Sequence, residues 1–291
     1  MTVLELIERC SARLDEAGVC FGHGTTNAFD EAAWLVLWKL GLPLDGLDDF
    51  ASRTVDHAGV QAATALVDER IRSRRPAAYL TGEAWLQGVP FTVDERVIVP
   101  RSLIAEVLAE GLVDAWLGHD PARVLDLCTG NGSLAVLAAM AWPQAEIDAC
   151  DLSSDALAVA RLNVDRHALA GRIALLQGDG LAAVTGRSAY DLILCNPPYV
   201  NRRSMAALPP EYLAEPALAL DGGEDGMDFV RALIVAAPGH LAPGGVLVLE
   251  IGHEKPHFDA AFPRLEVVWL PCSGGDEQVL LVTREALEAA R

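Results

Sequence analysis

The segment from Arg123 to Ser133 reads RVLDLCTGNGS, in which an apolar run, RVLDL (123–127), is followed by a turn that contains Gly130 and Gly132. The run has the length of a buried strand, and glycine lets the backbone turn tightly and approach a ligand closely. The helix that we expect after Gly132 would present free N–H groups, which favour a carboxylate. The segment predicts a strand, a tight turn and a helix, with a ligand-binding site at the turn. The alternative is a purely structural turn.

Further apolar runs follow, separated by helical sequence: EIDACD (146–151), RIALLQGD (172–179), DLILCN (191–196) and GVLVLEI (245–251). Strands that are apolar throughout are expected in a parallel sheet covered on both faces. This alternation predicts an α/β domain with a doubly wound, Rossmann-like sheet. Two last runs, LEVVWLP (265–271) and EQVLLVTRE (277–285), flank a Ser-Gly-Gly turn and predict an antiparallel pair at one edge.

The first part of the chain has a different pattern. Apolar residues recur at helical spacing in 3–14, 30–40 and 60–71, whereas 85–99 alternates like a β-hairpin. We therefore divide the chain into a helical domain (1–82), a hairpin linker (83–100) and an α/β domain (101–291). Arginines follow the third helical stretch, and they favour either a solvated helix face or a partner-binding patch: Arg70, Arg72, Arg74 and Arg75.

Composition limits the partners. Of 291 residues, 52% are hydrophobic, so the chain can bury a large core, and its net charge is −19. Because affinity for nucleic acid depends mostly on neutralising phosphates, this charge disfavours a nucleic-acid substrate and fits a basic protein partner.

The cysteines and the N-terminal sequence bear on metal binding and on the cellular compartment. Six cysteines include no CxxC pair, so we expect no metal site. The N-terminus, MTVLELIERC, lacks the unbroken apolar core of a signal peptide, and no apolar run reaches membrane-spanning length. We therefore expect a cytoplasmic protein without a membrane partner.

Acidic residues recur at the ends of the predicted strands. Asp126 lies in the first run, Asp151 ends the second and Asp179 ends the third. A carboxylate at the Asp151 position can accept the hydroxyl protons of a ribose, and Asp179 could accept from an adenine amino group. One such acid could instead cap a helix. Three acidic residues at the ends of three neighbouring strands indicate a nucleoside-type ligand.

The fourth strand ends in Asn196-Pro197-Pro198-Tyr199. Two prolines remove N–H donors and fix φ, so the carbonyls of Asn196 and Pro197 and the Asn196 side-chain oxygen form a rigid set of acceptors. They could hold both N–H bonds of a planar –NH2 group, with Tyr199 stacked on it. A structural Pro-Pro turn is the alternative. No general base stands out: His23, His167 and His253 are typical of surface or capping histidines.

Together, Asp126-x-x-Thr-Gly-x-Gly132, Asp151 and Asn196–Tyr199 resemble the class I S-adenosylmethionine methyltransferases that modify amino nitrogens. The helical domain, the hairpin and Val99-Pro100-Arg101 narrow the resemblance to the glutamine N(5)-methyltransferases of the translation machinery. It implies S-adenosyl-L-methionine as cofactor and a helical domain that recognises a protein. It implies catalytic roles for Asn196, Pro197, Pro198 and Tyr199, with Asn196, Pro197, Tyr199 and Arg101 contacting the substrate. The implied cofactor-binding residues are Asp126, Thr129, Gly130, Asn131, Gly132, Asp151, Leu152, Asp179, Gly180 and Asn196.

One branch of that family modifies release factors and the other modifies large-subunit ribosomal protein L three. Phe21-Gly-His-Gly-Thr-x-Asn27, Val99-Pro-Arg-Ser102 with Glu106, and Cys128 resemble the ribosomal-protein branch. The release-factor branch usually has glycine at the Cys128 position. A release-factor enzyme, an enzyme that methylates amino groups of nucleic acid, and a non-catalytic cofactor-binding module are the competing hypotheses. Arg101 could pair with an acidic group near the cofactor or with Glu106.

Overall fold

The structure is a computed structural model that describes residues 1–290. Seven strands form one sheet in the order β5-β4-β3-β6-β7-β9-β8, and the first five of these strands run parallel. Strand β9 is antiparallel to β7, and β8 is antiparallel to β9. The strands are β3 (Arg123–Leu127), β4 (Glu146–Asp151), β5 (Ile173–Gln177), β6 (Tyr190–Cys195), β7 (Leu241–Glu250), β8 (Val268–Leu270) and β9 (Val279–Thr283). The predicted doubly wound sheet and its antiparallel edge are confirmed.

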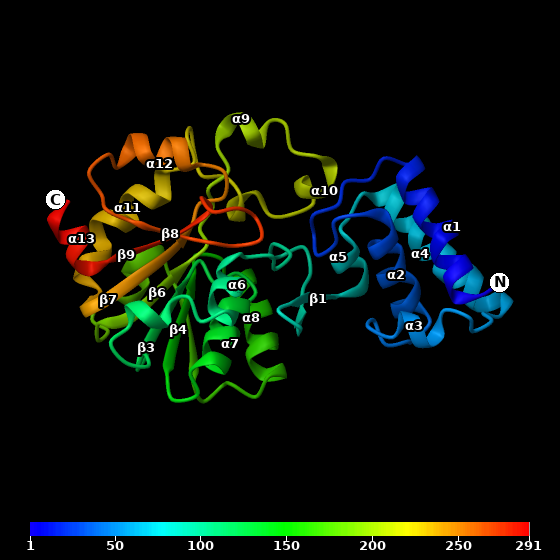
Figure 1. Cartoon of the computed structure of the whole chain (residues 1–291), viewed down its shortest axis with the longest axis horizontal. Helices are drawn as coiled ribbons and strands as arrows, with labels where there is room; N and C mark the ends of the chain where they lie inside the picture. The colour runs from blue at the N-terminus through cyan, green and yellow to red at the C-terminus, as the bar shows by residue number, and fades with distance from the viewer. Residues whose placement is uncertain (291) are drawn as a thin grey trace.

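Helices cover both faces of this sheet, as Figure 1 shows. Neighbouring residues of one strand enter different cores: Val124 packs with the helices on one face, and Leu125 with those on the other. The first layer holds α6 (Ile104–Ala109), α7 (Ser133–Ala141) and α8 (Ser154–Arg166); the second holds α11 (Asp228–Ala236), α12 (Lys255–Ala261) and α13 (Arg284–Ala289). Short 3-10 helices occupy connections: η1 (Asp114–Trp116), η2 (Gly180–Val184), η3 (Ala217–Ala219) and η4 (Ala237–Gly239). Burial on both faces explains why these strands are apolar throughout.

A separate helical lobe, blue to cyan at the right of Figure 1, forms the N-terminal part. Its helices are α1 (Val3–Glu16), α2 (Ala28–Lys39), α3 (Leu47–Phe50), α4 (His57–Ser73) and α5 (Ala77–Thr81). Thr2 and Glu5 form a reciprocal capping box that begins α1. The predicted apolar stripes of α1, α2 and α4 meet in one core of their own. The predicted helical region is therefore confirmed.

A short hairpin joins the lobes. It consists of β1 (Glu83–Leu86) and β2 (Val89–Thr92), and Gln87 and Gly88 turn between them with positive φ. The second strand is shorter than the predicted alternation, because residues 93–100 leave the ladder. Buried Asn163 of α8 fastens the hairpin: its Oδ1 accepts from the Thr92 N–H at 2.7 Å, and its Nδ2 donates to the Asn131 carbonyl at 2.8 Å. One side chain thus joins the hairpin, α8 and the glycine loop.

A loop after β6 extends from the sheet to the helical lobe. It contains α9 (Arg202–Met205), α10 (Pro210–Leu213) and η3, and α10 lies beside the blue lobe in Figure 1. Backbone hydrogen bonds between Val200 and both Leu220 and Gly222 close the base of the loop, directly after Tyr199. Across residues 1–290, no helix combines the length and the apolar character that crossing a membrane requires.

Candidate functional site

The parallel register brings the predicted strand ends together. Leu127 pairs with Cys150 on one side and with Cys195 on the other. The residues that follow these positions are Cys128, Asp151 and Asn196, so they meet at the carboxyl edge of the sheet. Strand β5, next to β4, adds Asp179 to the same edge. Ligands of doubly wound sheets bind at this edge.

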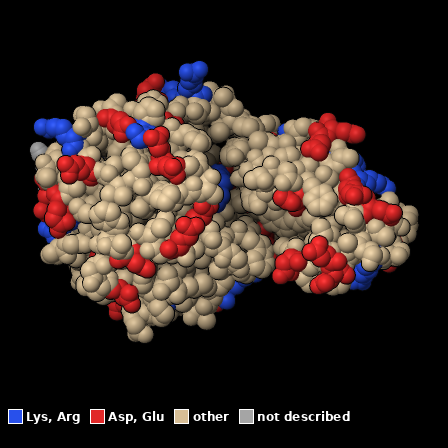
Figure 2. Space-filling model, in the orientation of Figure 1, with Lys and Arg blue, Asp and Glu red and all other residues tan. Residues whose placement is uncertain are grey.

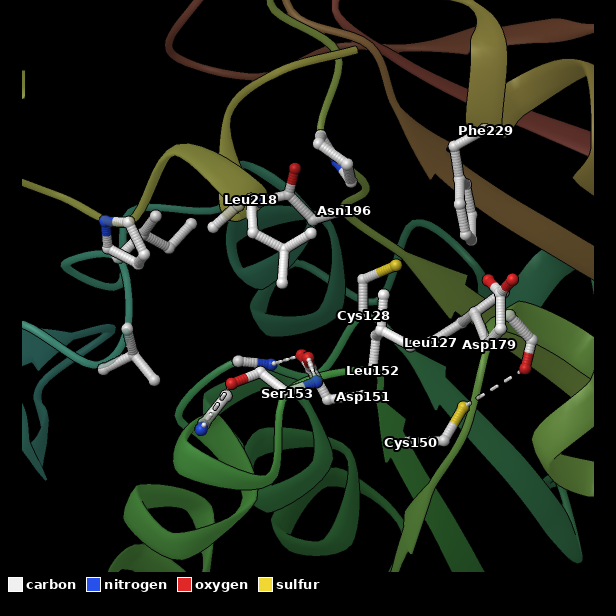
Figure 3. Close-up of a pocket in the computed structure, with 18 of the residues that line it drawn as sticks. Leu127, Cys128, Cys150, Asp151, Leu152, Ser153, Asp179, Asn196, Leu218 and Phe229 are labelled. Atoms are coloured by element: carbon white, nitrogen blue, oxygen red, sulfur yellow. Dashed lines mark hydrogen bonds between the residues drawn. The ribbon is translucent and has the colours of Figure 1, made fainter. Parts of the chain in front are cut away.

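A pocket of about 170 Å³ opens there to solvent (Figure 3). In the close-up, Asn196 and Leu218 lie above, Asp151 and Ser153 lie below, and Asp179 and Phe229 lie at the right. The predicted residues that line the pocket are Gly130, Asp151, Leu152, Asp179, Gly180, Asn196 and Pro198. The other predicted residues are not among those that line it: Asp126, Thr129, Asn131, Gly132, Pro197, Tyr199 and Arg101.

The glycine loop is held by its own side chains. Buried Asp126 accepts hydrogen bonds from the Thr129 hydroxyl and the Ala135 N–H, and Asn131 accepts from the Ser133 N–H. The prediction of free N–H groups at the start of α7 is therefore wrong for Ser133 and Ala135. Burial raises the pKa of Asp126 to about 7, although the Thr129 and Ala135 donors oppose this shift. Asp126 therefore holds the glycine loop in shape through these two hydrogen bonds.

Gly132 has two reasons to be glycine. Its φ is +81°, and an added Cβ would lie 3.2 Å from the Cβ of Ala160 on α8. We expect Gly132→Ala to lower the free energy of unfolding by about 1–3 kcal/mol, because an alanine there combines a left-handed backbone with this close contact. Chemical denaturation measures the change. Gly118→Ala is the control, because Gly118 has an ordinary φ and open space around it; equal losses in both variants would contradict the account.

Asp151 joins the glycine loop to the pocket. Its Oδ2 accepts from the Gly130 N–H and its Oδ1 from the Ser153 N–H, both at 2.9 Å. Burial raises its pKa, and these N–H donors oppose the shift. Helix α8 is capped by Ser153, so Asp151 is not the cap that its position allowed. Each Asp151 oxygen keeps acceptor capacity on a pocket wall, which suits vicinal hydroxyl groups.

The opposite part of the pocket suits a planar base. Phe229 lies over Gly180, whose added Cβ would be 3.5 Å from the ring, and Leu152 and Cys150 add apolar surface. Within residues 1–290, the Asp179 carboxylate makes no hydrogen bond or ion pair, which leaves it available to an amino group. Hydroxyl acceptors, a flat apolar slot and a free carboxylate together fit an adenosine moiety.

The Asn196–Tyr199 segment begins where β6 ends. Among residues 1–290, no hydrogen bond uses the Asn196 side chain or the carbonyls of Asn196 and Pro197. Tyr199 is fixed beneath this segment: its hydroxyl donates to Glu250 Oε1 at 3.3 Å, and its ring lies where a Cβ on Gly252 would clash, at 2.6 Å. Burial, followed by the nearby Glu250 carboxylate, raises the pKa of Tyr199. The acceptor oxygens of Asn196 and Pro197 are therefore unpaired, and Tyr199 holds the segment that carries them in place.

Arg101 pairs with Glu215, not with Glu106. Its guanidinium donates to both Glu215 oxygens, at 2.6 and 2.7 Å, and Glu106 instead accepts from Ser273. Glu215 also accepts the Val99 N–H at 2.8 Å. Glu215 directly precedes Pro216, which lines the pocket. Of the two partners considered, the acidic group near the pocket is therefore the correct one.

Both interpretations of the arginines at the end of α4 are incomplete. Arg70 is fully buried and binds Glu31 and Glu211, and Arg74 also pairs with Glu211. Arg72 and Arg75 make exposed pairs with Glu69 and Glu95. Arg70 and Arg74 attach the loop after β6 to the helical lobe.

The histidine predictions hold in part. His167 ends α8 and contacts the Pro90 carbonyl, and His253 is exposed. His23 is instead buried, with its ring 4.3 Å from that of Tyr212, so its interpretation as a surface or capping residue is wrong. Glu211, Glu215 and Glu250 are buried carboxylates that could not be predicted, since no local sequence pattern marks a carboxylate as buried.

The comparisons with known proteins are consistent with this geometry. A family model described as "Methyltransferase small domain" matches residues 105–217. The chain is 55% identical over 289 residues to the ribosomal protein uL3 glutamine methyltransferase of Bordetella pertussis, covering 98% of this chain and 96% of the relative. It is 50% identical to the protein of the same name from Burkholderia pseudomallei, covering 99% of this chain and 96% of the relative.

Solved structures share the fold at low identity. A methyltransferase from Pyrococcus furiosus is 19% identical, with a TM-score of 0.50, covering 68% of this chain and 90% of that one. The hMettl16 catalytic domain, solved with a MAT2A 3′UTR hairpin, is 13% identical, with a TM-score of 0.52, covering 78% of this chain and 81% of that one. At these identities the likeness concerns the fold alone.

Proposed function

The chain belongs to the family of ribosomal protein uL3 glutamine methyltransferases, and we propose that it moves the methyl group of S-adenosylmethionine to the side-chain amide nitrogen of a glutamine in uL3. The observation that supports this most is the unpaired acceptor set at Asn196 and Pro197, which adjoins a pocket suited to adenosine. A module that only bound the cofactor would not need such acceptors.

The chemistry follows from what these acceptors can do. The Asn196 side-chain oxygen and the Pro197 carbonyl accept the two N–H bonds of the glutamine amide, which orients the nitrogen and increases its electron density. The nitrogen forms a bond to the methyl carbon as the carbon–sulfur bond breaks, and the sulfur keeps the electron pair. The extra N–H proton then passes to water. Glu250 and Pro198 keep the acceptors in place.

The cofactor is held by residues of two kinds. The first kind lines the pocket that would receive it: Asp151, Leu152, Asp179, Gly180 and Gly130. The second kind holds the glycine loop in the required shape: Asp126, Thr129, Asn131 and Gly132. Their predicted role in cofactor binding is therefore indirect.

Asp151→Ala should weaken binding of S-adenosylmethionine by about 10- to 100-fold, because hydrogen bonds to a charged acceptor contribute about 1.5–3 kcal/mol. Isothermal titration calorimetry measures this change. Asp165→Ala provides the control, since Asp165 is an exposed carboxylate near the far end of α8. Unchanged affinity in the Asp151 variant would remove the ribose assignment.

The charge of the molecule suits a basic protein substrate. On the face drawn in Figure 2, acidic side chains are scattered over both lobes and basic ones are few. Complementary charge accelerates encounter with a basic partner and opposes binding to phosphate backbones. We therefore propose that nucleic acid is not the direct substrate, that residues 1–82 recognise the protein, and that the enzyme acts in the cytoplasm.

A transfer assay tests this function. Labelled S-adenosylmethionine is offered with purified uL3, with a peptide-chain release factor and with unmethylated DNA in parallel reactions. We expect label on uL3, and its loss when the acceptor glutamine is replaced. Label on the release factor would retain the chemistry and change the substrate; label on DNA would overturn the proposal.

A further inference from the structure

The loop tip, which consists of α10, η3 and the residues between them, touches the helical lobe on one side and the cofactor pocket on the other. Glu211, Tyr212 and Glu215 contact the lobe. Directly after them, Pro216, Leu218 and Ala219 line the pocket. Only a few residues therefore separate an interdomain contact from a wall of the pocket.

Glu215 is the centre of this contact. It is 4% exposed and takes the Val99 N–H and both arms of the Arg101 guanidinium. Its Oε2 also lies 3.4 Å from Nε2 of buried His23, which comes from the helical lobe. Burial is the largest single influence and would raise the pKa of Glu215, but the Arg101 charge, the Arg101 hydrogen bonds and nearby His23 together lower the pKa to about 2. Glu215 is thus a buried anion at neutral pH.

The helical lobe is shaped to receive this tip. Gly22 lies so close to Tyr212 that an added Cβ would be 2.5 Å from the Tyr212 hydroxyl, and the His23 ring packs on the ring of the same tyrosine. The Arg101 guanidinium also lies over the Tyr212 ring, 5.3 Å from its centre. The Phe21–Asn27 motif therefore packs against the loop tip.

We propose that Glu215 is a positioning residue through which the helical lobe sets the pocket wall at Pro216–Ala219, so that the Phe21–Asn27 motif supports cofactor binding as well as any contact with the protein substrate. Arg101 and Val99 hydrogen-bond to Glu215 from the hairpin side, and the His23 ring lies beside it on the lobe side. The backbone passes directly from this anchor into the wall.

The inference rests on the proposed function only in taking S-adenosylmethionine as the ligand of the pocket. Its test uses the product, S-adenosylhomocysteine, as a probe and needs no protein substrate. Calorimetric affinity is measured for full-length wild type, Glu215→Gln and His23→Phe. The glutamine keeps the shape of Glu215 and removes its charge, and the phenylalanine keeps the ring contact with Tyr212.

We expect Glu215→Gln to weaken binding of S-adenosylhomocysteine by about tenfold. His23→Phe should weaken it in the same direction, and the double variant should lose less than the sum of the two. Asp191→Asn is the matched control, because Asp191, like Glu215, accepts hydrogen bonds from backbone N–H groups, here those of Ala122 and Arg123, and does not line the pocket. It should bind the probe like wild type.

Hydrogen exchange separates positioning from general stability. Amides of residues 217–220 should exchange faster in the Glu215 and His23 variants, whereas the strands should exchange as in wild type. Wild-type affinity in both variants would overturn the inference and leave the proposed function intact. Conversely, the wild-type enzyme could fail to methylate uL3 while the Glu215 and His23 variants still bind the probe more weakly. That result would refute only the proposed function.

Discussion

Asn196→Ala is expected to lower kcat for methyl transfer by about 10²- to 10³-fold, the loss seen when one preorganised polar group is removed from a transition state. The structure leaves the Asn196 side chain without an internal partner, so its truncation breaks no hydrogen bond of the fold. Affinity for S-adenosylmethionine should remain within a few-fold of wild type, because Asp151 and Asp179 are untouched. Single-turnover transfer and calorimetry measure the two quantities separately.

Gln144→Ala provides the control for removing an amide side chain, since Gln144 is exposed and far from the pocket. It should transfer methyl groups like wild type. If Asn196→Ala instead abolished cofactor binding and left kcat unchanged at saturation, Asn196 would belong to the cofactor site and not to the acceptor of the methyl group.

Arg70→Ala should lower the free energy of unfolding by about 3–5 kcal/mol, the usual result of removing one partner from a buried ion pair. Arg70 is fully buried, and its guanidinium binds Glu31 Oε1 at 2.8 Å and the Cys20 carbonyl at 2.9 Å. It also lies 3.4 Å from Glu211 Oε1. The alanine leaves Glu31 buried without its cation, and Arg74 becomes the remaining cation beside Glu211. Denaturant unfolding followed by circular dichroism measures the loss.

Arg72→Ala is the matched control on the same helix. Arg72 is 73% exposed and pairs only with Glu69, so its loss should change stability by no more than about 0.5 kcal/mol. Equal effects of the two substitutions would mean that Arg70 is solvated in solution and that the loop is not fastened through it.

The sheet could be predicted because its signal is local. Each central strand is a short apolar run buried on both faces, and RVLDL and EIDACD match β3 and β4 residue for residue. Once those runs are parallel, their ends lie at one edge, so Asp151, Asp179 and Asn196 could be grouped before any contact was known.

The attachment between the lobes could not be predicted in the same way. Arg70 and Glu211 are 141 positions apart, and Arg101 and Glu215 are 114 apart. Spacing and periodicity describe neighbours on one helix or strand, so they carry no information about such pairs. The same limit explains why His23 was assigned to the surface and why the loop after β6 received no prediction.

Peptide mapping of methylated uL3 tests the central claim most directly. After reaction with wild-type enzyme, fragmentation should place a single methyl group on a glutamine side chain, and acid hydrolysis should release it as methylamine, because it is bound to an amide nitrogen. The Asn196→Ala enzyme should modify that peptide about 10²- to 10³-fold more slowly. A methyl group on lysine, arginine or a carboxylate, whether it survives acid hydrolysis or is released as a product other than methylamine, would contradict the account. The acceptors at Asn196 and Pro197 are suited to a planar amide.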